Sequence, residues 1–172
     1  VNEFGSNSMS GDGDFIVVEA DEFDKSFLEL HPTIAIINNL DLEHLDCYEN
    51  MDDLQKSFAQ FGNSVPFYGK VAINVDSKNT NQLIPMIKRP ILTFGFSTHA
   101  EIQAKNTNFK NTQTTFDLFI DKKYITHIEL QVPGKHNISN ALGAIAISRE
   151  LGVTTKSIQK GLKKYSGVWR RF

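Results

Sequence analysis

The sequence predicts an α/β protein with a mostly parallel sheet flanked by helices and a small three-stranded antiparallel sheet. The first observation is a set of short apolar runs without polar alternation, which is typical of strands buried on both faces of a parallel sheet. The second is that helical patterns separate these runs, giving a β–α–β–α–β order. The third is a change, beyond residue 100, to the apolar–polar alternation of half-exposed antiparallel strands.

The first half of the chain carries the parallel part of this pattern. Its apolar runs predict strands at 14–21, 33–38, 70–75 and 91–96. A helix is predicted over 51–65, where apolar residues recur at helical spacing and Asp52 and Asp53 complement the dipole of the first turn. A weaker helix is predicted over 77–87, interrupted by Pro85.

The second half predicts a meander followed by two helices. Alternating patterns with short polar connections predict antiparallel strands at 101–110, 114–121 and 123–132. The stretch 137–151 is apolar nearly all round and predicts a buried helix that ends at Gly152. A basic amphipathic helix is predicted over 154–165. Residues 1–13 are rich in Gly, Ser and Asn and predict a flexible lead-in.

Composition excludes several classes of function. The 172 residues suffice for one domain with a substantial core, and the net charge of −2 gives no basic surface for nucleic acid. No apolar run approaches the ~20 residues of a membrane span. The single cysteine, Cys47, cannot form an internal disulfide and fits a reducing compartment, so we expect a cytoplasmic protein.

Carboxylates follow the first predicted strand. Glu19 ends it, and Asp21, Glu22 and Asp24 come next. Ligands bind at the carboxyl ends of the strands in open α/β sheets, and hard oxygen ligands there suit Mg²⁺ with phosphate oxygens. An acidic surface turn, with Asp24 capping a helix, explains the same residues equally well, and the spacing leaves both interpretations open.

The stretch NLDLEHLD places a second cluster directly after the strand predicted at 33–38. Asp41, Glu43 and Asp46 surround His44. If the two strands are neighbours, Asp41 and His44 lie at the same edge of the sheet as Glu19. An isolated histidine is more often a structural residue, but two acidic clusters at adjacent strand ends make a metal site about as probable, so both interpretations stay open.

The stretch VPGKHNISNALGAIAIS begins with a glycine that permits a tight turn, Gly134. His136, Asn137 and Asn140 come at the start of the predicted helix. Either asparagine could be the N-cap. However, an asparagine offers the donor and acceptor needed to read adenine, and two of them three residues apart share one helical face. Capping alone requires only one.

The stretch GVWRRF contains two arginines, Arg170 and Arg171. They are either solvated charges or bidentate phosphate ligands. Cys47 has no base pattern beside it, so we expect a small packed residue.

Taken in order, VVEADEFDKSFLELHPTIAIINNLDLEHLDCY, FYGKVAINVDS, VPGKHNISNALGAIAIS and GVWRRF closely resemble the central domain of the Mur ligases over residues 14–172. The resemblance implies an enzyme that uses ATP and Mg²⁺ to activate a carboxylate of a UDP-sugar as an acyl phosphate, which an amine then attacks. It implies that Glu19 and His44 bind Mg²⁺ and that His44 and Arg171 are catalytic. It further implies that the nucleotide is bound by His136, Asn137, Asn140 and Arg171.

Within this family the pattern favours members that join L-alanine to UDP-N-acetylmuramate, in the synthesis of cell-wall peptidoglycan. The alternatives are a sister ligase that adds a recycled tripeptide, and a non-catalytic nucleotide-binding module. A site that binds only a metal or an acidic partner is a third, which the asparagine pair disfavours.

Three departures from the family pattern matter. The usual NxExDH pattern is altered because Asp41 and Glu43 exchange the two acid types, although charge is retained. Lys56 does not match the offset of the carbamylated lysine of some relatives. The 172 residues contain no GxxGK[ST] phosphate loop. We therefore expect a partial central domain, with the phosphate loop and the N- and C-terminal domains elsewhere in the same polypeptide.

Overall fold

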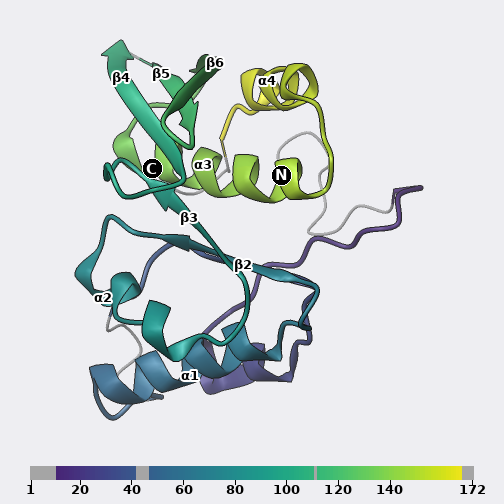
Figure 1. Ribbon diagram of the computed structural model, residues 1–172, viewed down its shortest axis with the longest axis vertical. Coiled ribbons are helices and arrows are strands. Elements are labelled where there is room, and N and C mark those ends of the chain that lie inside the picture. Colours follow the sequence, from purple (N-terminus) through teal and green to yellow (C-terminus); the bar gives the residue numbers. More distant parts are fainter. Residues whose placement is uncertain (1–10, 42–46, 111, 168–172) are drawn as a thin grey trace.

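The computed structural model describes residues 11–41, 47–110 and 112–167. Within them, one six-stranded sheet runs in the order β1-β2-β3-β4-β5-β6 (Figure 1). The first four strands are mutually parallel and the last two add antiparallel pairs. Their bounds are β1 (Ile34–Ile37), β2 (Lys70–Asn74), β3 (Ile91–Gly95), β4 (Ile102–Lys110), β5 (Gln113–Ile120) and β6 (Lys123–Leu130). The predicted α/β class and these six strands are confirmed.

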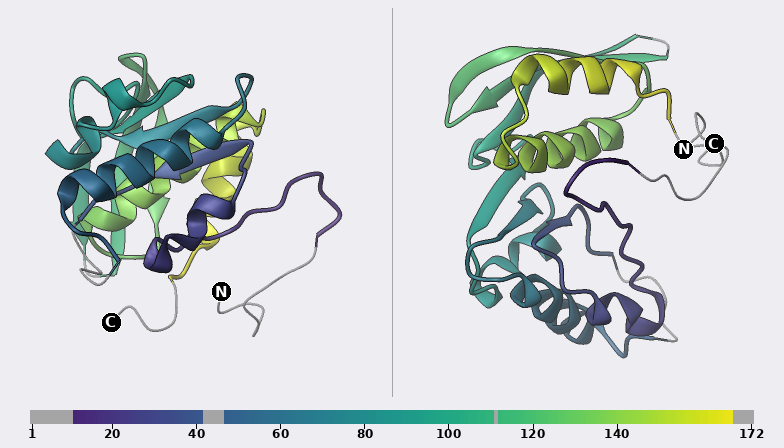
Figure 2. Two further views of the ribbon diagram at one scale, coloured as in Figure 1. Left: turned by 90° about the horizontal axis from the view of Figure 1, so that it is seen from below. Right: turned by 90° about the vertical axis from the view of Figure 1, so that its right-hand side faces the viewer.

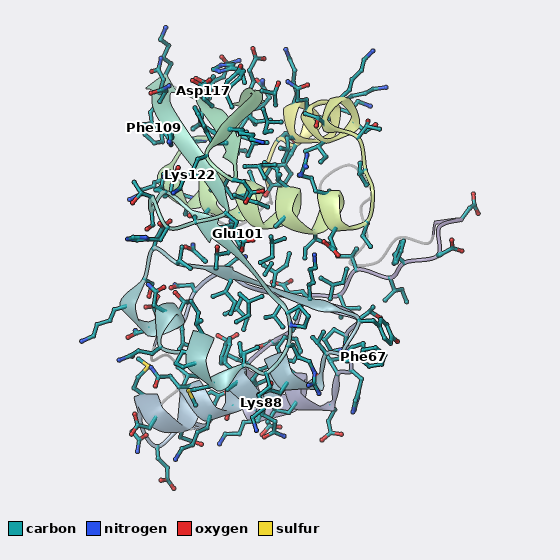
Figure 3. All side chains as sticks on the ribbon, viewed as in Figure 1. Phe67, Lys88, Glu101, Phe109, Asp117 and Lys122 are labelled. Carbon is teal, nitrogen blue, oxygen red and sulfur yellow. The ribbon has the colours of Figure 1, made fainter. Side chains whose placement is uncertain are left out.

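The antiparallel strands do not form a separate sheet, which corrects one part of the prediction. β4 pairs in parallel with β3 through Phe94↔Ile102 and Gly95↔Gln103, and in antiparallel with β5 along most of its length. Glu101, labelled in Figure 3, accepts a hydrogen bond from the backbone nitrogen of Thr93 at 2.9 Å. The buried start of β4 joins the meander to the parallel strands, so the alternating pattern marks a continuation of one sheet.

The strand predicted at 14–21 is wrong. No strand is assigned there, and Phe15, Ile16, Val17 and Val18 are 63%, 88%, 97% and 59% exposed. A buried parallel strand requires hydrogen bonding to a neighbour and cover on both faces. β1 is at the edge of the described sheet and these residues do not pair with it, so the apolar run stays extended and exposed.

Helices cover both faces of the parallel strands (Figures 1 and 2). Val71 and Ile73 of β2 face a core shared with α1, whereas Ala72 faces a second core beneath α3. The two faces of β2 are therefore both buried, as the apolar runs predict. The helices are α1 (Met51–Ser64), α2 (Lys78–Asn81), α3 (Lys135–Glu150) and α4 (Thr155–Lys164), with 3-10 turns η1 (Phe23–Glu29) and η2 (Ile84–Met86).

The local signals for α1 and α2 are confirmed with small changes. Asn50 is the N-cap of α1, and its side chain accepts a hydrogen bond from the backbone nitrogen of Asp53 at 3.0 Å. The helix predicted over 77–87 is divided into α2 and η2, and Pro85 lies at the start of the second piece, because proline cannot continue a preceding helix.

The helix α3 begins two residues earlier than predicted, at Lys135. His136 and Asn137 therefore belong to its first turn. One side of α3 packs on the sheet so closely that a β-carbon at Gly143 would lie 3.1 Å from the Asn38 side chain and 3.2 Å from Phe94. The helix ends just before Gly152, which adopts a left-handed conformation with φ +77° and is the predicted stop of the helix.

Among the described helices, none is both long enough and apolar enough to cross a lipid bilayer.

Candidate functional site: a groove at the carboxyl ends of the parallel strands

A groove of about 1130 Å³ opens beside β1. The extended residues 14–20, the strand β1 with the loop after it, the end of β2 and one side of α3 line this groove. Figure 2 shows residues 11–20 running between the layer of α3 and the layer of α1. The volume lies slightly above the range of about 300–1,000 Å³ that is typical of small-molecule and cofactor sites, so a nucleotide-sized ligand can be accommodated.

Three of the predicted site residues meet in this groove. Glu19, His136 and Asn140 all line it, together with Asp41. All three predicted residues are exposed, so their polar atoms are accessible to a ligand. The fold thus brings the first acidic cluster and the start of α3 to one cavity, although they are far apart in the sequence.

The loop after β1 is held by amide side chains. Asn39 donates its side-chain nitrogen to the carboxylate of Asp41 and accepts from the backbone nitrogen of Leu40 at 2.9 Å. Asn79 of α2 donates to the carbonyl oxygen of Leu40 at 2.9 Å. These bonds help to fix the position of Asp41 at the groove.

The start of α3 depends on the glycine that precedes it. Gly134 has φ +103°, and a β-carbon there would lie 2.8 Å from the imidazole carbon Cε1 of His136. The histidine ring therefore rests over a residue that must lack a side chain. Gly134 is also the N-cap, and no side chain caps the helix, so neither Asn137 nor Asn140 has the capping role.

Asn137 differs from Asn140 in its surroundings. Its side-chain nitrogen donates to the carbonyl oxygen of Pro133 at 2.6 Å, and it is half-buried outside the groove lining. Asn140 is exposed at the groove, one helical turn further on. The two asparagines share a face, as the spacing predicts, but in this arrangement Asn137 closes the turn before α3.

The predicted metal ligands and the predicted phosphate-binding arginine are only partly within the described residues. His44 lies in the 42–46 gap, and Arg171 lies beyond residue 167; both are outside the described residues. Among the residues that are described, no group of three or more His, Cys, Asp or Glu side chains is arranged to hold a metal ion. The carboxylates of Glu19 and Asp41 nevertheless line one groove, and this oxygen donor set fits Mg²⁺, which uses one or two carboxylates together with phosphate oxygens.

Asp76 is a carboxylate of the groove that the sequence analysis did not identify. It follows β2 and lines the groove beside Ser77. The signal was available, because an acidic residue directly after an apolar run marks the carboxyl end of a parallel strand.

A smaller hollow of about 550 Å³ lies beside α1, with Lys25, Tyr48 and Asp53 among its lining residues. Lys25 donates to both carboxylate oxygens of Asp53, at 2.9 and 3.1 Å, and this bond lowers the pKa of Asp53. Tyr48 donates to the carbonyl oxygen of Glu22 at 2.7 Å, and burial followed by the charge of Glu22 raises its pKa to about 12. These contacts attach η1 to α1. Cys47 also lines this hollow; it is partly buried and packs against the core shared by β1, β2 and α1, as predicted for a small packed residue.

The sheet order, the groove at the carboxyl ends of parallel strands and the helix start with its paired asparagines define an α/β nucleotide-binding class of domain. The Mur ligase middle domain matches residues 4–148, and the chain belongs to the Mur ligase family.

Two curated relatives align with nearly the whole chain. UDP-N-acetylmuramate–L-alanine ligase of Persephonella marina is 46% identical over 169 residues, which are 98% of this chain and 36% of the relative. The enzyme of the same name from Salinibacter ruber is 40% identical over 172 residues, which are all of this chain and 36% of the relative. The chain therefore spans little more than a third of the length of these relatives.

Solved structures show the same fold at low sequence identity. MurF from Acinetobacter baumannii superimposes with a TM-score of 0.74 at 22% identity, covering 85% of this chain and 32% of that one. MurF from Thermotoga maritima, solved in complex with ADP, has a TM-score of 0.67 at 15% identity, covering 80% of this chain and 31% of that one.

Proposed function

We propose that residues 14–172 are the larger part of the central, ATP-binding domain of a cytoplasmic ligase that joins L-alanine to UDP-N-acetylmuramate. The observation that carries the proposal is the single groove lined by Glu19, His136 and Asn140. The ligase names of the relatives that align with the whole chain support the choice of substrates. The ADP complex of a protein with the same fold supports an adenine nucleotide.

In the proposed reaction, the γ-phosphoryl group of ATP is transferred to the carboxylate of UDP-N-acetylmuramate, so an acyl phosphate forms and ADP leaves. The amine of L-alanine then attacks the acyl carbon, so an amide bond forms and inorganic phosphate leaves. Two anions must approach each other in the first step, and such a transfer requires cationic groups to neutralise their charge.

In this proposal, different residues bind the base, the metal ion and the phosphates. Asn140 and His136 hold the base side of the nucleotide at the start of α3, and Asn137 supports that turn. Glu19 and His44 hold Mg²⁺ near the phosphates, and the guanidinium of Arg171 neutralises phosphate charge. The phosphate loop and the domains that grip the UDP-sugar and the amino acid are supplied elsewhere in the same polypeptide.

Phosphate release by the full-length polypeptide tests this proposal. The assay contains ATP, Mg²⁺ and UDP-N-acetylmuramate, with either L-alanine or the tripeptide L-alanyl-γ-D-glutamyl-diaminopimelate as the acceptor. Phosphate release that depends on L-alanine is expected. Release that depends only on the tripeptide would assign the chain to the sister ligase. If the protein binds ATP but releases no phosphate with either acceptor, it is a non-catalytic nucleotide-binding module.

A further inference from the structure

The turn that follows β3 is held through its backbone from two sides. The carboxylate of Asp76, which follows β2, accepts hydrogen bonds from the backbone nitrogens of Phe96 at 2.8 Å and Ser97 at 2.9 Å. Gln103 of β4 is buried, and its side-chain nitrogen donates to the carbonyl oxygens of Phe96 and Ser97, each at 2.9 Å. All four backbone groups of these two residues are thereby engaged, so the turn has little freedom to move.

The same turn contacts the start of α3. The ring of Phe96 packs against the core beneath α3, and the ammonium of Lys135 lies 4.7 Å from the centre of that ring. Lys135 is the first residue of α3 and directly precedes His136. The Phe96 ring therefore links the turn to the core beneath α3 and to the first residue of the helix.

The sequence around Asp76 leaves space for this carboxylate. A β-carbon at residue 95 would lie 2.6 Å from the Asp76 oxygen Oδ1, so the Asp76 side chain fits there because residue 95 is a glycine. The side chain of Asn74 accepts a hydrogen bond from the backbone nitrogen of Asp76 at 2.9 Å, which fixes its direction. Asp76 also lines the groove in which His136 and Asn140 lie.

We infer that Asp76 is a positioning residue for nucleotide binding: by holding the Phe96–Ser97 turn beneath α3, it sets where His136 and Asn140 stand in the groove. The inference rests on the proposed function, because it takes an adenine nucleotide as the ligand of the groove. Asp76 itself need not touch the nucleotide. Its effect passes through the turn and Lys135.

The test compares Asp76→Ala, Asp76→Asn and wild type in the full-length protein. ADP affinity is measured by calorimetry, and amide hydrogen exchange is measured in peptides that cover 94–98 and 134–140. Asp76→Ala is expected to weaken ADP binding about fivefold, the order expected for a lost hydrogen-bond constraint. Exchange is expected to rise in both peptides. Asp76→Asn should be intermediate, because its remaining side-chain oxygen can still accept from both nitrogens.

The matched control is Asp52→Asn, an exposed carboxylate on α1 that is not among the groove-lining residues. This variant should change neither the ADP affinity nor the amide hydrogen exchange of the two peptides. A lower melting temperature with unchanged ADP affinity and unchanged exchange at 134–140 would overturn the inference, because it would reduce Asp76 to a local stabilising role. If Asp76→Ala does not fold, the same criteria apply to Asp76→Asn.

The two proposals fail in different ways. Wild-type protein that binds no ADP would contradict the proposed function. In that case unchanged exchange at 134–140 in the Asp76 variants would still contradict the positioning role, and increased exchange would support the coupling between the turn and α3.

Discussion

Two segments face each other across the groove, and they are built differently. Glu19 belongs to an extended, exposed stretch that is not part of the described sheet, whereas His136 and Asn140 stand on a helix packed tightly on it. The helix side is therefore preformed by packing within the described residues. The backbone that carries Glu19, by contrast, does not pair with any strand of the described sheet. The proposed base recognition and the proposed metal binding can therefore be disturbed separately.

The largest expected effect separates turnover from nucleotide binding. In the full-length protein, His44→Ala should lower kcat by about 10²- to 10³-fold, the order seen when one group that stabilises transition-state charge is removed. ADP affinity should stay nearly unchanged, because the base side of the groove is intact. His99→Ala, at an exposed turn, is the control. Turnover near the wild-type value would contradict the proposed role of His44 in binding Mg²⁺.

The second prediction tests the extended side of the groove. Glu19→Gln keeps the shape of the side chain but removes its charge, so it should lower kcat by about tenfold or more and shift the Mg²⁺ titration to higher concentration. Glu29→Gln, an exposed residue of η1, should leave the titration in place. An unchanged Mg²⁺ dependence in Glu19→Gln would restore the interpretation of 19–24 as an acidic surface turn.

The third prediction disturbs the helix side through its backbone. Gly134→Ala places a β-carbon against the His136 ring at a positive φ, so it should lower the free energy of unfolding by about 1–3 kcal/mol and weaken ADP binding. Urea unfolding and calorimetry measure the two effects. Gly161→Ala is the matched control, because no heavy atom lies near its added β-carbon and its φ is not positive. Equal stability of the two variants would show that the start of α3 relaxes easily.

The fourth prediction concerns the two asparagines. Asn140→Ala should raise the KM for ATP about tenfold with little change in kcat, as expected for the loss of a ground-state hydrogen-bonding group. Asn108→Ala, at an exposed position of β4 that is not among the groove-lining residues, is the control. A KM equal to wild type would mean that Asn140 does not contact the nucleotide, and since Gly134 is the N-cap of α3 it would not be a cap either.

The smallest expected effect lies away from the groove, at the ion pair that attaches η1 to α1. The pKa of Asp53 is lowered below its ordinary value of 3.8 by Lys25, so its contribution to stability is complete well above that pH and is lost as the pH falls through the lowered value. In Asp53→Asn, the free energy of unfolding should therefore fall slightly less steeply as the pH is lowered than it does in the wild type. Equally steep curves for wild type and variant in urea unfolding between about pH 2 and 6 would contradict this.

Local sequence signals predicted most of the elements, with small errors in their limits. The helices at 51–65 and 154–165 follow from apolar spacing and from the caps Asn50 and Thr154, which act over one turn and need no distant contact. The motif residues Glu19, His136 and Asn140 were also identified in advance, and they line one groove.

The sequence by itself determined the periods, caps and stops of the elements, because these depend on residues a few positions apart. Only the tertiary structure decided that 14–21 lies outside the sheet, that the meander continues the parallel strands, and that Asp76 reaches the turn after β3. Strand pairing and backbone contacts of this kind join segments that are distant along the chain. Their free energy depends on which neighbour is present in space, and no local pattern of residues contains that information.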